Sequence, residues 1–377
     1  MSLSLPGEPA DARSLTDVVV HLQAALDGRS SWFPAVRSAV VFVVDGLGAR
    51  NLSQRAAYAR TLTAAGGRRA VARTVFPSTT AAALTSLLTG ADPGEHGIVG
   101  YRVRLPGTDV VSNQLTGWQD DGLDPLTWQR SEPLLQRWQA IGRPAFVVSR
   151  SRYRGTGFSV ATVRGADFIG ADDLRERALT AAALAAQHPG ALVYLYAPEL
   201  DTIGHRHGWQ SDQWAAQLET LDGVVRSFAA ALAPGVGAVI TADHGMVDVP
   251  RHRQVLLQDG DALVDGVRQI AGEPRMLHLY VEDAAGEAVL ARWRQAEASR
   301  SWVVSRDEAI SAGLFGRVTD AVRPRIGDVI VAARAGIAYY DDRLADKAPQ
   351  RMIGQHGSLT DEERAVPLIR LGALAGS

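Results

Sequence analysis

Three apolar runs in the sequence are each followed, within a few residues, by carboxylate or imidazole side chains. A further histidine lies between glycines in a polar stretch near the C-terminus. Ligands of open α/β sheets bind outside the carboxyl ends of the strands, so these side chains are candidates for one shared site. Carboxylate and imidazole ligands together favour Zn²⁺ and, less exclusively, Mn²⁺ or iron. The six candidate metal ligands are Asp45, Asp201, His205, Asp243, His244 and His356.

Each candidate also has a purely structural interpretation. Asp45 precedes a glycine, and Asp-Gly pairs usually form turns. The pair Asp243-His244 would begin a helix, His205 would be a solvated loop residue, and His356 would stabilise a turn. The recurrence of one pattern at four places in a single chain favours a metal site over four independent structural roles.

The local structure around Asp201 and His205 has two readings. Their spacing of four would place both side chains on one face of a helix. The nearby Pro198 and Gly204 favour a loop instead. We therefore expect a loop that directs both side chains toward the strand ends.

A hydroxyl side chain is the candidate nucleophile. Pro77 is followed by Ser78, Thr79 and Thr80, and then by an Ala/Leu-rich helical stretch. A threonine at a helix start is most often an N-cap. The same position attracts phosphate, because the free N–H groups and the helix dipole favour anions. A bound cation lowers the pKa of an alcohol enough for it to attack.

A framework of alternating strands and helices must position these residues. Continuous apolar strands that alternate with helices predict a doubly wound, mostly parallel α/β sheet with helices on both faces. The expected strands are 39–44, 70–75, 145–149, 191–196, 238–241, 276–281 and 328–332. The expected helices are 15–26, 80–88, 133–141, 173–187, 211–232 and 287–298.

Two segments differ from this alternation. Residues 101–170 are rich in Gly, Trp, Arg and Asp, and we expect them to leave the sheet as an excursion. Residues 251–349 contain strand-like runs, a helix and many arginines, and we expect an inserted α+β cap subdomain there. The catalytic core then comprises residues 1–250 and 350–377.

Composition narrows the choice of partners and compartment. The 377 residues include 39 Lys+Arg and 41 Asp+Glu, a net charge of −2 that does not favour a nucleic-acid polymer as partner. The absence of cysteine excludes disulfides, thiolate metal sites and a cysteine nucleophile. The N-terminal stretch lacks the pattern of a signal peptide, and the apolar runs are too short to span a bilayer. We expect a cytoplasmic protein without a membrane partner.

The order of the motifs resembles the alkaline phosphatase superfamily, and most of all its nucleotide pyrophosphatase/phosphodiesterase branch. That branch begins its nucleophile helix with an aromatic-Pro-Ser/Thr-x-Thr motif and continues with Thr-Gly, His-Gly-Ile, Asp-x-x-Gly-His, Asp-His-Gly-Met and Gly-x-His-Gly. The matching segments of this chain are 76–80, 89–90, 96–98, 201–205, 243–246 and 354–357.

The resemblance implies a two-metal phosphate ester hydrolase, first of all a phosphodiesterase or nucleotide pyrophosphatase. The threonine three residues after Pro77 is the nucleophile in this family, which selects Thr80 and leaves Thr79 as the helix cap. Two ions, Zn²⁺ or alternatively Mn²⁺, clamp the attacking and leaving oxygens, and a phospho-threonine intermediate is then hydrolysed by water. One ion is held by Asp45, Asp243 and His244, and the other by Asp201, His205 and His356.

The substrate pocket departs from the family pattern. Many diesterases of this branch have Phe-Pro-Asn directly after the nucleophile, where this chain has three alanines at 81–83. Tyr101 stands where the branch has an asparagine that binds a phosphate oxygen, and it is the expected substrate-binding residue. Further pocket candidates are Trp118, Trp128, Tyr153 and Arg154. The expected substrate is a small phosphate ester or nucleotide.

Rival functions stay open on this evidence. A phosphomonoesterase or a phosphonate hydrolase would use the same two-metal scaffold. A sulfatase is disfavoured, because sulfatases modify a cysteine or serine nucleophile and this chain has no cysteine. A rival of another class is a metal-stabilised binding protein without activity, which the complete set of nucleophile and ligands argues against.

Overall fold

The computed structural model describes residues 5–9, 11–66 and 70–375 of the chain. Its central sheet has six strands in the order β18-β8-β1-β7-β5-β6, all parallel except β18, which runs antiparallel to β8. The strands are β1 (Ser38–Val44), β5 (Ala145–Ser149), β6 (Asp167–Gly170), β7 (Leu192–Ala197), β8 (Val236–Thr241) and β18 (Ile369–Gly372).

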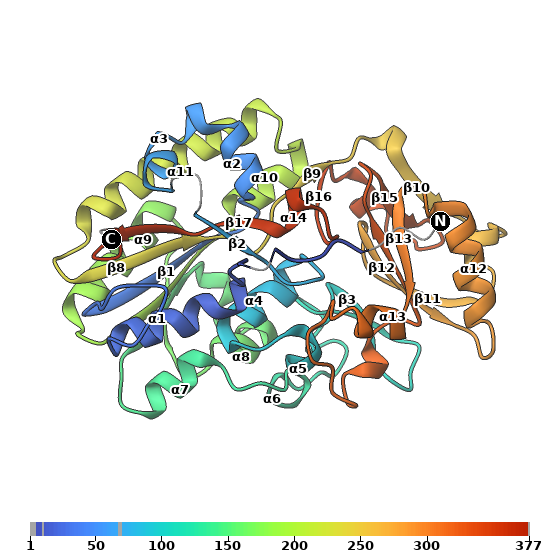
Figure 1. Ribbon diagram of the computed structural model, residues 1–377, viewed down its shortest axis with the longest axis horizontal. Coiled ribbons are helices and arrows are strands. Elements are labelled where there is room, and N and C mark those ends of the chain that lie inside the picture. The colour runs from blue at the N-terminus through green and yellow to red at the C-terminus, as the bar shows by residue number, and fades with distance from the viewer. Residues whose placement is uncertain (1–4, 10, 67–69, 376–377) are drawn as a thin grey trace.

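Helices cover both faces of the central sheet (Figure 1). On one face lie α9 and α11 with α3 and α10, and on the other α1, α4 and α7. The central strand β1 is buried along its whole length, as expected for a strand covered on both sides. The helices are α1 (Val18–Leu26), α2 (Ala49–Gln54), α3 (Arg60–Gly66), α4 (Thr80–Thr89), α5 (Pro93–His96), α6 (Pro125–Trp128), α7 (Leu134–Ala140), α8 (Gly157–Val163), α9 (Leu174–Gln187), α10 (Glu199–His207) and α11 (Asp212–Ala231).

A second, antiparallel sheet lies at the other end of the molecule, in the order β11-β12-β14-β13 (Figure 1). Its strands are β11 (Val267–Glu273), β12 (Met276–Val281), β13 (Ser301–Ser305) and β14 (Val329–Ala333). Helices α12 (Gly286–Glu297) and α13 (Arg306–Ser311) pack beside it. The apolar residues of this sheet and α12 form a core of their own.

Short two-stranded ladders join the remaining segments. They pair β2 (Val71–Arg73) with β17 (Ala365–Pro367), β3 (Arg102–Arg104) with β4 (Val111–Asn113), β9 (Val247–Asp248) with β16 (Gly354–Gln355), and β10 (Gln254–Leu257) with β15 (Ala338–Asp341). The last helix is α14 (Asp361–Arg364). None of the helices in the described part of the chain has the length and apolar composition needed to cross a membrane.

The fold class predicted from the sequence is confirmed, and three local predictions are wrong. The excursion 101–170 returns to the central sheet, because β5 and β6 are two of its strands. The strand expected at 70–75 shrinks to β2, which pairs with β17 outside that sheet. Asp201 and His205 lie in helix α10 and not in a loop, because Pro198 occupies the N-cap, where it needs no amide hydrogen.

Candidate active site

The register of the central sheet brings the three aspartates to one edge. Val44 pairs with Ala197 across β1 and β7, and Val43 pairs with Thr241 across β1 and β8. The three strands therefore end at nearly the same level, and the residues that follow them meet there. Asp45, Asp201 and Asp243 follow these three strands.

One group of possible ligands contains Asp45, Asp243 and His244. Each offers a ligand atom, and these atoms all lie within 4.8 Å of one another. His244 Nε2 is 3.4 Å from Asp45 Oδ1 and 3.5 Å from Asp243 Oδ2. The Gly46 amide donates to Asp243 Oδ1 at 3.2 Å, which leaves Oδ2 directed to the group.

A second group contains Asp201, His244 and His356, again with ligand atoms within 4.8 Å of one another. The rings of His244 and His356 stack with centroids 3.5 Å apart. His205 stands beside this group, with Nε2 3.4 Å from Asp201 Oδ1 and its ring 5.2 Å from that of His356. All six predicted side chains are thus neighbours, and His244 lies between the two sets that the sequence suggested.

The three histidines share one orientation. In each, Nδ1 donates to a backbone carbonyl: His205 to Gly354 at 2.7 Å, His244 to Gly245 at 3.0 Å and His356 to Ser78 at 2.9 Å. A carbonyl can only accept, so Nδ1 carries a proton and Nε2 is the ring nitrogen that faces the cluster, where a neutral ring would offer its lone pair. This is the arrangement that holds metal-binding imidazoles in place.

The charges of the cluster favour bound cations. Asp45 Oδ1, Asp201 Oδ1 and Asp243 Oδ2 are buried and have no hydrogen-bond partner among the described residues. Burial and the neighbouring carboxylates of Asp243 and Asp201 raise the pKa of Asp45 well above its usual range. Burial and the imidazoles of His244 and His205 hold the pKa of His356 well below its usual range. Crowded carboxylates beside imidazole nitrogens form a donor set that divalent cations fit.

Thr80 is the hydroxyl that reaches this cluster. It is the first residue of α4, and its Oγ1 donates to His244 Nε2 at 3.1 Å. Thr79 occupies the N-cap position, but its side chain makes no capping hydrogen bond. The prediction that Thr79 caps the helix through its hydroxyl is therefore wrong, because that side chain turns toward Glu273.

Close packing holds the loop that carries Asp243 and His244. The Asn51 side chain exchanges two hydrogen bonds with the backbone of Met246, at 3.0 and 3.1 Å. A Cβ added to Gly245 would meet the carbonyl oxygen of Glu362 at 2.0 Å and the Cα of Gly48 at 2.8 Å. Backbone atoms cannot swing away as a flexible side chain can, so this position accepts only glycine.

Replacing Gly245 by alanine is therefore expected to lower the free energy of unfolding by about 1–3 kcal/mol. Gly223 in α11 is the matched control, because a Cβ there meets nothing within 4 Å. Gly223→Ala is expected to raise the free energy of unfolding by up to about 1 kcal/mol, since alanine favours helices. Chemical denaturation of both variants measures the two effects, and equal effects would contradict the packing argument.

Two polar residues near the site were missed by the sequence analysis. Tyr196, within β7, donates its hydroxyl to Asp45 Oδ2. Glu273 comes from the second sheet, and burial raises its pKa to about 8, while the Thr79 hydroxyl and the Tyr101 amide lower it. Neither Glu273 oxygen completes a hydrogen bond of normal geometry within the described part of the chain. Neither residue follows a strand or belongs to a motif, so no local signal marks them.

A cavity of about 490 Å³ opens beside Thr80, between α4, α8 and the ends of β5 and β7. Apolar and aromatic side chains dominate its wall, and Arg152 is its charged residue. The aromatic lining residues are Tyr153, Phe158, Phe168, Tyr194 and Tyr196.

Tyr153 is the one of the four further pocket candidates that lines this cavity. Trp118 is buried in a separate small core, Trp128 stacks on Arg325, and Arg154 lies over Phe168. Tyr101 is half-buried and is absent from the described wall of the cavity. Arg152, two residues before Arg154, was missed. The sequence does not show which of two nearby arginines has its side chain directed toward the cavity by the backbone.

Comparison with known structures identifies similar folds. Murine ectonucleotide pyrophosphatase/phosphodiesterase 5 is 16% identical, with a TM-score of 0.68 over 89% of this chain and 88% of that one. An inactive threonine-to-alanine variant of the murine protein has been solved in complex with AMP. Phosphonoacetate hydrolase from Sinorhizobium meliloti 1021, solved with phosphonoacetate, is 19% identical, with a TM-score of 0.67 over 90% and 91% of the two chains.

Sequence comparison gives a partial relative and a family. A phosphopentomutase from Methylobacterium nodulans is 37% identical over 120 residues, which span 30% of this chain and 28% of that protein. The family model of type I phosphodiesterases and nucleotide pyrophosphatases matches residues 39–359. The match covers the second sheet and five of the six strands of the central sheet, all but β18, and confirms the resemblance seen in the motifs. The chain belongs to the type I phosphodiesterase/nucleotide pyrophosphatase family, a family of phosphoester hydrolases.

Proposed function

We propose that this chain hydrolyses phosphodiesters, including nucleotide-type pyrophosphates, by attack of Thr80 at a two-metal site. The observation that carries the proposal is the position of Thr80 Oγ1, which lies 3.1 Å from His244 Nε2 at the edge of the cluster. A hydroxyl beside a set of imidazoles and crowded carboxylates is placed to be activated by a cation. Family membership supports phosphoester hydrolysis as the reaction class.

The chain offers enough ligands for two cations, with Zn²⁺ favoured and Mn²⁺ as the alternative. The unpartnered carboxylate oxygens and the inward Nε2 atoms fit such a role. When bound, two divalent cations polarise the phosphoryl group and stabilise the attacking and leaving oxygens of an in-line displacement. The first would be held by Asp45, Asp243 and His244, and the second by Asp201, His205 and His356.

The chemical steps fall to Thr80 and the start of α4. Thr80 Oγ1 loses its proton to solvent and forms a bond to phosphorus, and the leaving oxygen departs with the electrons of the broken P–O bond and takes up a proton. Water then attacks phosphorus, the bond from phosphorus to Oγ1 breaks, and Oγ1 regains a proton from the attacking water. The Thr79 side chain does not cap α4, so N–H groups of the first turn are left to bind a phosphoryl oxygen.

The cavity beside Thr80 suggests which chemical group is attached to the phosphate of the substrate. Its aromatic wall suits a flat ring, and its volume of about 490 Å³ lies within the range of small-molecule pockets. A diester with one aromatic or nucleoside group would place the ring there and the phosphorus at Thr80. The murine structural neighbour was solved in complex with AMP, which supports a nucleotide as the substrate class.

A phosphonate hydrolase is the second candidate. Arg152 on the cavity wall would pair with a carboxylate such as that of phosphonoacetate, which the bacterial structural neighbour binds. Release of inorganic phosphate from phosphonoacetate, compared with hydrolysis of p-nitrophenyl esters by the same preparation, separates the two candidates.

We expect kcat/KM to be higher for bis(p-nitrophenyl) phosphate than for p-nitrophenyl phosphate. In the described part of the chain, Arg152 is the cation on the wall beside Thr80, and it donates to the Tyr153 hydroxyl at 2.9 Å. A single guanidinium on the wall of an apolar cavity is a weak site for a phosphate dianion, whereas the diester is a monoanion that keeps one aromatic ring to bury there while the other leaves. A monoester hydrolysed faster than the diester would reverse the assignment.

A further inference from the structure

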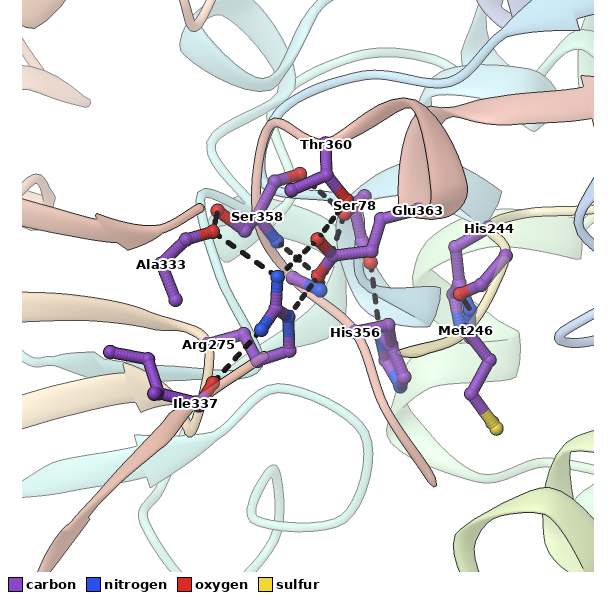
Figure 2. A network of polar contacts seen from close by, with 12 residues as sticks. Ser78, His244, Met246, Arg275, Ala333, Ile337, His356, Ser358, Thr360 and Glu363 are labelled. Atoms are coloured by element: carbon purple, nitrogen blue, oxygen red, sulfur yellow. Dashed lines mark hydrogen bonds and ion pairs between the residues drawn. The ribbon is translucent and has the colours of Figure 1, made fainter. Parts of the chain in front are cut away.

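The turn between β11 and β12 carries a buried arginine that joins the second sheet to the catalytic core. Arg275 and Glu363 have side chains only 1% and 0% exposed. Arg275 Nε donates to Glu363 Oε1 at 2.7 Å, and Nη2 donates to Oε2 at 2.8 Å. Figure 2 shows this bidentate pair at the centre of a polar network.

The remaining donors of Arg275 are also satisfied. Nη1 donates to the carbonyls of Ala335 and Ile337 at 2.8 and 2.9 Å, and Nη2 donates to Ala333 at 3.2 Å. All five guanidinium N–H groups thus have acceptors. A buried ion pair contributes less to stability than apolar packing does. The role of this pair is therefore to fix the relative positions of the segments that it joins.

Glu363 connects the ion pair by hydrogen bonds to two loops of the site. Its carboxylate accepts from the Ser358 amide at 3.0 Å and from the Thr360 hydroxyl at 2.6 Å. Its backbone carbonyl accepts from the Gly245 amide at 2.8 Å. Ser358 is two residues after His356, and Gly245 directly follows His244.

Ser78 joins the same network to the segment that carries Thr80. Its hydroxyl donates to the Ser358 carbonyl at 2.8 Å and accepts from the Gly357 amide at 3.2 Å. Its carbonyl accepts the Nδ1 proton of His356 at 2.9 Å. The Ser358 hydroxyl in turn donates to the carbonyl of Ala333 in β14, so the second sheet meets this segment at a second point (Figure 2).

We propose that Arg275 is a positioning residue. Through Glu363 and Ser358 it fixes the orientation of the His356 imidazole and the position of the segment before Thr80. The second sheet is thereby coupled to catalysis. The inference rests on the proposed function, because it assigns the network a role in metal retention and turnover. Outer partners of metal ligands change metal affinity or activity by about 10- to 100-fold when they are replaced.

Two variants test the proposal without leaving a buried charge unpaired. Arg275→Met/Glu363→Leu removes the ion pair and fills its space with apolar groups. Replacing a buried ion pair in this way often leaves the stability of a protein unchanged or raises it. Ser358→Ala removes one hydroxyl, and the Ala333 carbonyl keeps Arg275 as a partner. Arg294→Met is the matched control: Arg294 of α12 pairs with Glu308 of α13 beside the second sheet, its Nη2 donates to both carboxylate oxygens, and both side chains are partly exposed.

The measurements are the rate at which Zn²⁺-loaded protein loses zinc to a chelator, kcat and KM for bis(p-nitrophenyl) phosphate, and the melting temperature. We expect the double variant to lose zinc about 10- to 100-fold faster and to show a kcat lower by a similar factor, with KM little changed. Ser358→Ala is expected to change both in the same direction by a smaller factor, and Arg294→Met to match the wild type.

The zinc-loss rate keeps the two proposals separate. A wild-type protein that holds zinc but does not cleave the diester would overturn the proposed function and leave the positioning role to be decided by zinc loss. Zinc loss and kcat equal to wild type in the folded double variant would reduce the network to a structural role. Should the double variant fail to fold, Arg275→Lys, which keeps the charge but loses the bidentate geometry, decides by the same two measurements.

Discussion

Replacement of Thr80 by alanine is expected to lower kcat for bis(p-nitrophenyl) phosphate by several orders of magnitude and to leave the fold intact. The variant loses the atom that bonds to phosphorus, so the covalent step is removed and not merely slowed. The stability cost is small, because Thr80 is the first residue of a helix and alanine is a strong helix former. Steady-state kinetics with circular dichroism measures both parts of the prediction.

Thr79→Ala is the control for that experiment. Thr79 lies next to Thr80 in the chain, but its hydroxyl neither caps α4 nor contacts His244 in the described structure. We expect this variant to keep activity within about tenfold of wild type and to lose less than the ~1 kcal/mol of a true cap. The opposite pattern would make Thr79 the nucleophile. Equal mild losses in both variants would mean that neither hydroxyl attacks and that water reacts directly.

Removal of divalent metal is expected to abolish activity and to lower the melting temperature. Without cations, the carboxylates of Asp45, Asp201 and Asp243 repel one another, and one buried oxygen of each lacks a hydrogen-bond partner among the described residues. Any cation that binds the folded state alone stabilises it by mass action. We expect about two ions per chain in untreated protein, from the two-metal arrangement of this reaction class, and recovery of activity with Zn²⁺ or Mn²⁺ after chelation.

Single ligand variants sharpen this test. His356→Ala should retain about one ion and lose most activity, since the two-metal arrangement requires both. His207→Ala is the matched control: His207 also lies on α10, about 200° around the helix from His205, and belongs to neither ligand group. Metal analysis by mass spectrometry measures the stoichiometry. Protein that contains no metal and gains no activity from either cation would refute the two-metal proposal.

Local patterns accounted for most of the central framework. The expected strands 145–149 and 276–281 coincide with β5 and β12, and five of the six expected helices begin and end within two residues of α4, α7, α9, α11 and α12. Helices α9, α11 and α12 are long, and β5 and β12 are continuous apolar runs, so their patterns are strong. The strands β6, β10 and β13 are short and mostly half-buried, and β15 has only four residues, so their patterns are too brief to be distinguished from loop sequence.

The sequence by itself determined the candidate site residues that the structure brings together, because each lies beside a local signal. Asp45 and Asp243 follow apolar strands, and Thr80 begins a helix directly after a proline-broken strand. A strand end or a helix start is encoded by its own neighbours, and the parallel topology of the sheet then brings such ends to a common edge. The family motifs strengthened the same assignment.

Only the tertiary structure decided how those side chains are held. Arg275 and Glu363 are 88 positions apart, Ser78 and His356 are 278 apart, and Tyr196 reaches Asp45 across 151 residues. No periodicity links residues at such separations. An arginine that forms a buried ion pair cannot be distinguished in the sequence from one that is exposed to solvent. The packing of the two sheets decides which residue it pairs with, and its neighbours in the chain do not. His244 likewise belongs to both ligand groups only in the folded protein, where its ring stacks on that of His356.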